Sequence, residues 1–253
     1  MYGVDVSHYQ LDIDWSQVRK SGKEFAILKA MYEGSRNRDE YFEKNYRDCI
    51  ENGFLTGAYI FIGSKSIADP VGDAYAFLHI LNGRGMKYGV WIDAEYSVLR
   101  AQGKQKIETI IQTEGDILRR AGYRVGVYCN YDWYKNVLTT SVKNSYPLWI
   151  ARYPKNDVGK IVSSLSPKDL KNTVAWQYSS KGKVPGIRGN VDLDVDYGFM
   201  PKKSVEEIAQ EVLDNKWGTR NTNPTRKQLL TNAGYNYIDV QNEVNRLLKS
   251  RNG

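Results

Sequence analysis

Eight short apolar segments, separated over much of the chain by amphipathic ones, are the feature that most limits how this sequence can fold. Their length and their β-branched and aromatic residues predict buried strands. The alternation of strand and helix in the first half predicts parallel strands joined by crossover helices. The predicted strands are 3–7, 25–30, 56–62, 88–95, 124–130, 148–153, 173–179 and 192–197, and the predicted helices are 15–21, 39–52, 67–81 and 104–121.

The number of strands favours a closed α/β barrel. Eight strands within residues 1–197 leave room only for short connections late in the chain. Three predicted helices are each followed by a glycine, Gly22, Gly53 or Gly122, where a helix often ends in the left-handed conformation. An open doubly wound sheet is the alternative, but no G-x-G-x-x-G motif opens a helix after the first strand.

A change of pattern near 198–203 (GFMPKK) divides the chain. Ser204 and Glu207 fit a capping box, and an apolar stripe follows them at helical spacing. Two further helices are predicted from Pro224 and around Val240. We therefore expect a barrel over residues 1–198, a linker over 199–203 and a small three-helix bundle over 204–250.

Composition excludes several classes of protein. The net charge is +7, yet no block of Lys and Arg indicates a nucleic-acid site. The chain has two histidines and two cysteines, which argues against a metal centre rich in these ligands. No uninterrupted apolar stretch of about 18 residues predicts a membrane span. We expect Cys49 and Cys129 to be free, buried thiols, and the oligomeric state is left open.

Acidic side chains at predicted strand ends are the candidates for chemistry. Asp93 and Glu95 are two apart on one strand and so point to the same face, while Asp5 and Asp192 lie on the first and last strands, which are neighbours in a closed barrel. Crowded carboxyls raise the pKa of at least one of them, which is what a glycosidase acid needs. A divalent metal site and a solvated strand edge remain alternatives.

Other polar residues near these acids receive structural interpretations. Asp194 and Asp196 are interpreted as loop or strand-edge polar residues. His8 is interpreted as a hydrogen-bonded structural histidine. Ser7, His8 and Asp5 lie too close along one strand to adopt the geometry of a catalytic triad.

Ordered motifs covering residues 1–198 resemble glycoside hydrolase family 25, the muramidase lysozymes of phages and bacteria. The matching words are VDVSHYQ (4–10), Trp15 and Val18, FAILKA (25–30), GAYIF (57–61), WIDAE (91–95), GVYCN (126–130), LWIARY (148–153), AWQYSS (175–180) and VPGIRGNVDLD (184–194). The resemblance implies an irregular TIM-like (β/α) barrel in which the last three strands lack full helices. It also implies hydrolysis of the β-1,4 bond between N-acetylmuramic acid and N-acetylglucosamine, with no metal and no cofactor.

The resemblance also implies roles for individual residues. Glu95 matches the general acid/base, and Asp93 the acid that orients the substrate's 2-acetamido group, whose carbonyl attacks the anomeric carbon with net retention. We expect Asp192 to stabilise positive charge and Asp5 to position groups and tune their pKa; which of Asp93 and Asp192 acts nearest the anomeric carbon stays open. Aromatic candidates for sugar contact are Tyr59, Phe61, Tyr128, Trp149 and Trp176, with packing as the alternative.

The tail resembles the three-helix cell-wall-binding repeat of some phage lysozymes. The matching words are IAQEV (208–212), KWG (216–218), RKQLL (226–230), AGY (233–235) and VQNEVN (240–245). The resemblance implies binding of muropeptide, and the candidate contacts are Trp217, Arg226, Tyr235 and Tyr237.

Three functions are weighed. A muramidase acting on bacterial peptidoglycan is favoured because all four carboxylates are present. A wall-binding protein with an inactive barrel, or a hydrolase of another polysaccharide such as a chitinase, are the alternatives; the residues before Asp93 lack the chitinase D-x-x-D-x-D-x-E pattern. No secretory signal is visible, so we expect an endolysin that accumulates in the host cytoplasm and reaches the wall after membrane permeabilisation, with non-classical secretion as the alternative.

Overall fold

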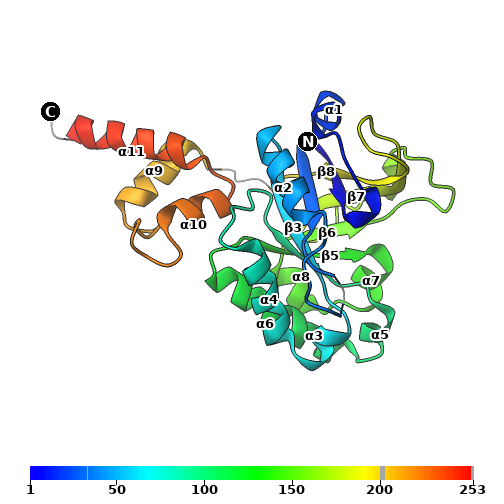
Figure 1. The fold of residues 1–253 in the computed structure, drawn as a ribbon. Helices are drawn as coiled ribbons and strands as arrows, with labels where there is room; N and C mark the ends of the chain where they lie inside the picture. The colour runs from blue at the N-terminus through cyan, green and yellow to red at the C-terminus, as the bar shows by residue number, and fades with distance from the viewer. Residues whose placement is uncertain (33, 200–202, 252–253) are drawn as a thin grey trace.

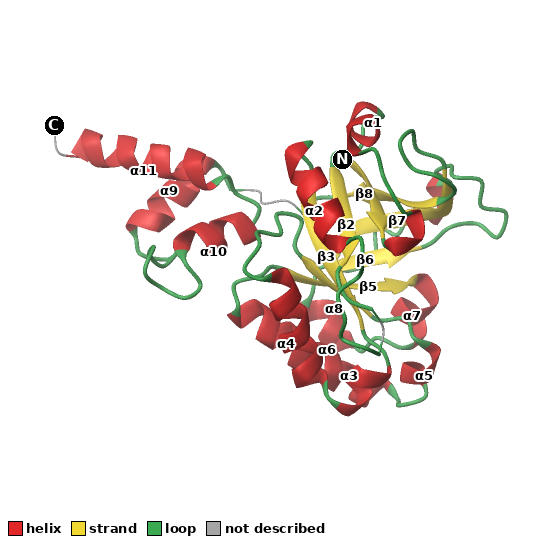
Figure 2. Cartoon of the chain, in the orientation of Figure 1, coloured by secondary structure: helices red, strands yellow, loops and turns green. Residues whose placement is uncertain are grey.

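The computed structural model describes residues 1–32, 34–199 and 203–251, and its strands form one closed barrel in chain order, β1 to β8 (Figures 1 and 2). This confirms the predicted α/β barrel. The strands are β1 Tyr2–Val6, β2 Phe25–Lys29, β3 Leu55–Phe61, β4 Val90–Asp93, β5 Val125–Asn130, β6 Leu148–Ala151, β7 Thr173–Gly182 and β8 Val191–Asp196.

The direction of the last strand differs from the prediction. Strands β1 to β7 pair in parallel, but β8 is antiparallel to both β7 and β1. Only residues 183–190 separate β7 from β8, and a parallel connection needs a crossover of a dozen residues or more. The parallel arrangement predicted from the first half of the chain therefore does not extend to β8, and the reversal decides which end of the barrel Asp192 reaches.

Helices cover the outside of the barrel (Figure 2). They are α1 Trp15–Lys20, α2 Phe42–Glu51, α3 Ser64–Ala68, α4 Pro70–Leu81, α5 Ser97–Arg100, α6 Lys104–Arg120, α7 Tyr131–Asn136 and α8 Thr140–Ser145. Gly22, Gly53 and Gly122 all have positive φ, as predicted for helix ends. Within residues 152–190 the structure has no α-helix, only a 3-10 turn at Ser163–Leu165, so the last three strands lack full helices as expected.

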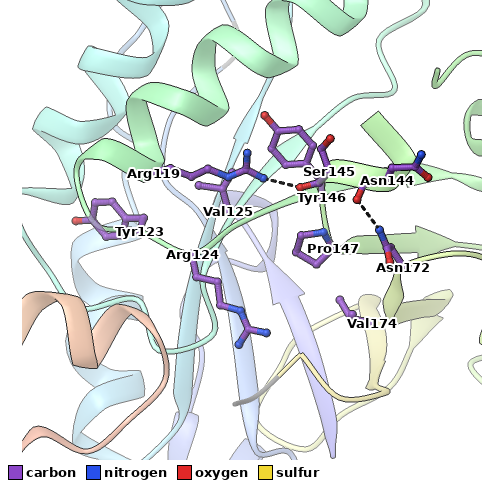
Figure 3. A pocket seen from close by; sticks show the side chains of 10 residues that line it. All are labelled: Arg119, Tyr123, Arg124, Val125, Asn144, Ser145, Tyr146, Pro147, Asn172 and Val174. Atoms are coloured by element: carbon purple, nitrogen blue, oxygen red, sulfur yellow. Dashed lines mark hydrogen bonds between the residues drawn. The ribbon is translucent and has the colours of Figure 1, made fainter. Parts of the chain in front are cut away.

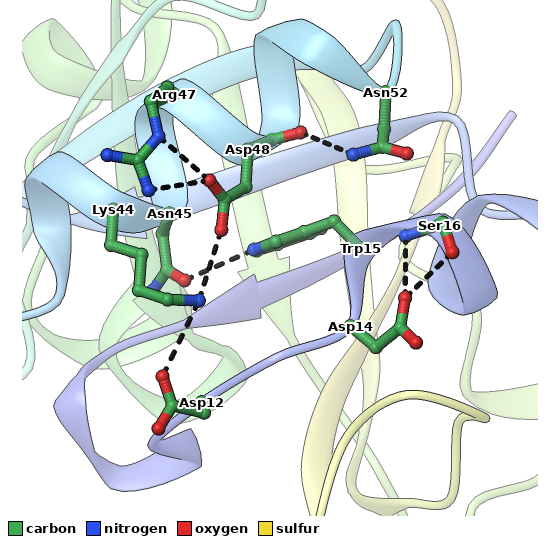
Figure 4. A network of polar contacts seen from close by, with 9 residues as sticks. All are labelled: Asp12, Asp14, Trp15, Ser16, Lys44, Asn45, Arg47, Asp48 and Asn52. Atoms are coloured by element: carbon green, nitrogen blue, oxygen red, sulfur yellow. Dashed lines mark hydrogen bonds and ion pairs between the residues drawn. The ribbon is translucent and has the colours of Figure 1, made fainter.

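A polar network ties α1 to α2 on the outside of the barrel (Figure 4). The Asp14 carboxylate caps α1 by accepting from the Ser16 backbone N–H at 3.1 Å. The buried Trp15 indole N–H donates to Asn45 Oδ1 at 3.1 Å, which satisfies a donor that would otherwise be costly to bury. Lys44 pairs with Asp48 at 3.1 Å. These contacts have a structural explanation and need no ligand.

Aromatic side chains fill the barrel interior below the strand ends. Phe25 stacks on Tyr88 with ring centroids 4.1 Å apart, and Trp91 meets Trp149 edge to face at 5.6 Å. Phe199 joins this cluster and is fully buried, with the Arg124 guanidinium 3.8 Å from its ring centroid. The predicted linker over 199–203 therefore begins too early, because Phe199 belongs to the barrel core.

Three helices follow the barrel: α9 Val205–Leu213, α10 Arg226–Asn232 and α11 Tyr237–Arg251. The predicted capping box is present, with the Glu207 N–H donating to Ser204 Oγ and the Ser204 N–H donating to Glu207 Oε2. The helices enclose their own small core, formed by Ile208, Ala209, Val212, Leu230, Val240 and Val244. We call residues 203–251 the helical module.

Two further expectations concern the chain as a whole. Cys49 and Cys129 are free and buried, as predicted, and burial raises the pKa of both thiols. Among the described residues, no helix has the length and apolar character needed to cross a membrane.

Glu114 on α6 gives a testable pH dependence of stability. Its side chain is fully buried beside Asp73, and burial is the main cause that raises the pKa of its carboxyl well above the ordinary value. The folded protein must therefore retain a proton that the unfolded chain releases above about pH 4.3. Stability falls with rising pH from that point up to the folded pKa, by as much as about 1.4 kcal/mol per pH unit.

Glu114→Gln should remove this pH dependence of the free energy of unfolding, since the amide keeps the shape of the side chain and carries no charge. In urea titrations, we expect the free energy of unfolding of the wild type to fall relative to that of the variant as the pH is raised from 5 to 8. Asp116→Asn, at an exposed position of the same helix, is the control and should show no such gain. Parallel pH profiles for the wild type and Glu114→Gln would contradict the prediction.

Candidate active site

Four carboxylates meet at one mouth of the barrel. Asp5 lies on β1, Asp93 ends β4, and Glu95 follows two residues later. Asp192 stands near the start of β8, and because β8 runs antiparallel, its start lies at the same mouth as the end of β1. The strand register places Asp192 directly opposite Asp5. The reversal of β8 thus brings the fourth acid to the others.

Gln177 holds Asp5 in place from the neighbouring strand. Its Nε2 donates to Asp5 Oδ2 at 2.9 Å, and its Oε1 accepts from the Tyr128 hydroxyl at 3.0 Å. All three side chains are buried. The sequence prediction did not include Gln177; the available signal was a polar residue at an inward position between two aromatic residues of β7.

Glu95 differs from the other acids in its surroundings. Its side chain is half-buried, and burial raises the pKa of its carboxyl while a hydrogen bond from the Asn130 side chain opposes the rise. A raised pKa keeps a carboxylic acid protonated closer to neutral pH, the condition for donating a proton to a leaving oxygen. Asn130 was not predicted as a site residue.

Burial also acts on Asp192, raising its pKa to about 9 with a further contribution from Asp5. A carboxyl in that state is a hydrogen-bond donor in the free protein and not an anion. For Asp192 to stabilise positive charge, as the family resemblance implies, it must lose its proton as that charge develops.

Asp194 corrects the sequence interpretation. It is fully buried inside the barrel, where its Oδ1 accepts from the Trp149 indole N–H at 2.9 Å, so it is not a loop or edge residue. Alternation along β8 places it on the same inward face as Asp192. Asp196 is partly buried at the other end of β8, where it accepts from the Tyr88 hydroxyl at 2.8 Å and the Phe199 N–H at 2.9 Å.

The five aromatic residues predicted to contact sugar differ in how far their side chains are exposed to solvent. Tyr59 and Phe61 lie near the C-terminal end of β3, and both are partly exposed, so they can contact a ligand. Tyr128 and Trp149 are buried beneath the carboxylates, with ring centroids 4.4 Å apart. Trp176 is wrong as a mouth residue: it points outward from β7, packs near Tyr178 and donates to the Arg152 carbonyl at 2.7 Å.

Two other polar side chains complete the surroundings. Lys29 ends β2, at the same end of the barrel as the end of β1, and its side chain is 5% exposed. The sequence signal for it was a lysine that closes an apolar run. His8 has its Nδ1 2.7 Å from Asp39 Oδ2, consistent with the predicted structural role. No group of three or more His, Cys, Asp or Glu in residues 1–32, 34–199 and 203–251 has the arrangement of a metal site.

A hollow at the opposite end of the barrel does not share this chemistry. It lies at the starts of β5 and β6 and is lined by Arg119, Arg124, Tyr146 and Asn172 (Figure 3). Arg119 donates to the Ser145 carbonyl at 2.8 Å and Asn172 to the Asn144 carbonyl at 3.1 Å. These groups bind the chain itself, and no carboxyl lines the hollow.

The helical module has a cleft of its own, lined by Thr219, Arg220, Thr225, Arg226, Lys227, Tyr237 and Gln241. Two predicted wall contacts, Arg226 and Tyr237, line it. The other two pack elsewhere: Trp217 donates to Glu211 Oε2 at 3.0 Å and meets Tyr235 edge to face at 6.0 Å. The cleft thus combines three cations with one aromatic ring.

An eight-stranded barrel with this cluster of acids defines a class of glycosidases, and comparison with known proteins agrees. Residues 4–187 match the family model for glycosyl hydrolases family 25, and residues 206–248 match the CW_7 repeat. The chain belongs to glycosyl hydrolase family 25.

Known lysozymes and family 25 structures are similar to this chain mainly over the barrel. The chain is 31% identical over 194 residues to an autolytic lysozyme of Clostridium acetobutylicum, covering 77% of this chain and 55% of that protein, so it spans little more than half of that relative. A family 25 glycosyl hydrolase structure from Bacillus anthracis has a TM-score of 0.65 and 27% identity, covering 78% of this chain and 89% of the other. The CTP1L endolysin shares the fold over 98% of this chain and 99% of its own, with a TM-score of 0.64 and 21% identity.

Proposed function

We propose that this protein is a peptidoglycan N-acetylmuramidase that hydrolyses the β-1,4 bond between N-acetylmuramic acid and N-acetylglucosamine. The observation that carries the proposal is the convergence of Asp5, Asp93, Glu95 and Asp192 at one mouth of a family 25 barrel. Membership of that family and similarity to a protein named as an autolytic lysozyme support the substrate class.

In this proposal Glu95 protonates the leaving glycosidic oxygen and later activates water. Its half-buried position and raised pKa suit both steps. Asp93 orients the 2-acetamido group, whose carbonyl oxygen attacks the anomeric carbon, so that the configuration is retained. This is one of the recognised exceptions to the usual two-carboxylate scheme. Asp192 faces the positive charge that develops, and Gln177 fixes Asp5 beside it. The mechanism uses no metal or cofactor.

The products test the assignment. Purified peptidoglycan is digested, and new reducing ends are identified by mass spectrometry after borohydride reduction. We expect reducing-end N-acetylmuramic acid. Reducing-end N-acetylglucosamine would make the protein a glucosaminidase and overturn the proposal. The absence of new ends from a protein that still pellets with the wall would support the alternative of a wall-binding protein with an inactive barrel.

We further propose that the helical module holds the protein on the wall through its cleft. Arg220, Arg226 and Lys227 supply positive charge for carboxylates of a muropeptide, and the Tyr237 ring supplies an apolar face. One copy of the repeat gives no avidity by itself, so its affinity rests on this single cleft.

Tyr237→Ala should weaken the pelleting of the protein with purified walls by about tenfold, since loss of one ring contact costs on the order of 1–2 kcal/mol. The adjacent Ile238→Ala is the matched control, because Ile238 is 64% exposed and does not line the cleft. Equal binding by the two variants would place the wall contact elsewhere on the protein.

A further inference from the structure

The segment that follows β6 exposes apolar side chains next to the mouth of the barrel. We call residues 154–162 (PKNDVGKIV) the rim loop; they lie between the LWIARY and AWQYSS motifs and belong to neither. Within the rim loop, Val158 is 71% exposed, Ile161 40% and Val162 36%. Isolated exposed apolar side chains are ordinary on a protein surface, whereas a group of them on one loop is typical of a contact surface.

Asp157 fixes the rim loop to the end of β7. Its carboxylate accepts from the Ser179 hydroxyl at 2.8 Å, the Ser180 N–H at 2.7 Å and the Gly159 N–H at 3.0 Å. Burial acts to raise the pKa of this carboxyl, but these hydrogen bonds hold it below its ordinary value. A Cβ on Gly159 would lie 3.1 Å from the Lys181 carbonyl oxygen, so the loop packs closely on the strand. Buried polar contacts therefore set the position of the loop, while its apolar side chains face solvent.

The rim loop adjoins the carboxylates of the mouth. The chain leaves β6 at its C-terminal end, and because β1 to β7 are parallel, this is the end at which the acids of β1 and β4 lie. Tyr153, which precedes the loop, is 41% exposed and interacts electrostatically with Asp192 and Glu95. Asp157 also interacts electrostatically with Asp192. A ligand on the rim loop is therefore close to a sugar held in the mouth.

The charge of the rim loop is positive. Lys155 and Lys160 are exposed within it, and Lys181 is exposed where it meets β7. Asp157 is the only acid in the loop, and it is buried. Such a surface suits a ligand that combines carboxylates with small apolar groups. In peptidoglycan, the glycan strand is uncharged where its lactyl groups carry peptides, whereas those peptides present carboxylates and alanine methyl groups.

On the basis of the proposed muramidase function, we propose that the rim loop binds the stem peptide of the N-acetylmuramic acid whose glycosidic bond is cut, so that the enzyme prefers glycan that carries peptides. The peptide starts on the sugar that reacts, and an extended chain reaches about 3.3–3.6 Å further with each residue. The exposed lysines of the loop pair with peptide carboxylates, while Val158 and Ile161 cover methyl groups. These side chains determine substrate preference and take no part in bond cleavage.

Cleavage of glycan with and without peptides tests this preference. Soluble glycan strands are used intact or after an amidase has removed their peptides, and kcat/KM is measured from the release of reducing ends. The variant that carries both Val158→Ser and Ile161→Ser should lose about tenfold in kcat/KM on peptide-bearing strands and under about twofold on stripped strands. Ile50→Ser is the matched control and should change neither value, because Ile50 is 46% exposed near the end of α2 that leads into β3, away from the mouth.

The helical module is identical in these three proteins, so its own affinity for peptide cancels in the comparison. A second measurement needs no catalysis. The amide resonances of Val158, Gly159 and Ile161 are followed by NMR as N-acetylmuramyl-L-alanyl-D-isoglutamine is added, with N-acetylmuramic acid as the peptide-free control. We expect larger shifts with the peptide-bearing sugar than with the control, and we expect the double variant to lose this difference.

Equal kcat/KM for the double variant and the wild type on peptide-bearing strands, or an equal loss on both kinds of strand, would overturn the inference and leave the muramidase assignment intact. Peptide-dependent shifts in a protein that releases no reducing ends would refute the muramidase assignment and keep the rim loop as a peptide-binding surface. Pelleting with phosphatidylglycerol vesicles that the double variant loses, with equal cleavage of both kinds of strand, would make the loop a membrane contact and the inference wrong.

Discussion

Replacement of Glu95 by glutamine is expected to lower the rate of glycan cleavage by about 10³-fold while leaving the protein folded and bound to the wall. The amide fills the same space and can accept from Asn130, but it has no proton to give to the leaving oxygen. Glu95 reaches the mouth from beyond the end of β4. The measurement is the initial rate of release of reducing ends from purified peptidoglycan.

Glu51→Gln, on the exposed side of α2, is the matched control and should keep the full rate. The pelleting assay with whole walls gives a second readout, because binding through the helical module does not involve Glu95. A Glu95→Gln variant within tenfold of the wild-type rate would remove Glu95 from the role of general acid. The remaining mouth carboxyls would then have to be tested in the same way.

Truncation of Phe199 is expected to have the largest effect on stability, a loss of about 3–5 kcal/mol in the free energy of unfolding. Phe199 closes the base of the barrel, fully buried against Tyr88 and Trp91, with ring centroids 5.2 and 4.6 Å away. A Cβ on Gly89 would lie 2.7 Å from the Phe199 ring, so the surroundings are shaped to that ring. Urea unfolding monitored by tryptophan fluorescence measures the change.

Two control variants set the scale for the loss of stability expected from Phe199→Ala. Phe199→Leu keeps most of the apolar volume and should cost under about 1.5 kcal/mol. Tyr75→Ala removes an aromatic ring that is 60% exposed on α4 and should change stability by under about 0.5 kcal/mol. If Phe199→Ala costs no more than Tyr75→Ala, the residue belongs to the linker, as the sequence pattern had placed it.

Much of the barrel could be predicted because its information is local. Apolar runs mark each strand, and glycines at Gly22 and Gly122 mark helix ends where φ is positive. The capping box at Ser204 and Glu207 sets the start of α9 by contacts three residues apart. Such signals depend only on residues close together in the chain, so they can be recognised in the sequence without a structure.

The sequence also identified the acids of the mouth but not how they are held. Asp93 and Glu95 share a face because a strand alternates with period two. Gln177, which bonds Asp5 across 172 positions of the chain, leaves no local signature that names its partner. Trp176 and Gln177 are adjacent in sequence and lie on opposite faces of β7. An aromatic residue at a strand end suggests sugar contact, so the sequence pattern pointed to Trp176, although Gln177 is the residue that reaches the carboxylates.

By itself, then, the sequence determined the eight strands, the longer helices α2, α4 and α6, the division into barrel and helical module, and the four candidate acids; the short helices α5, α7 and α8 were not predicted. Only the tertiary structure decided the direction of β8, the burial of Asp194 and the place of Phe199 in the core. Each of these depends on which strand lies beside which, and on the volume left inside a closed barrel. A carboxyl at the same position in an open strand would be solvated; enclosed in the barrel beside Trp149, Asp194 has its pKa raised by burial.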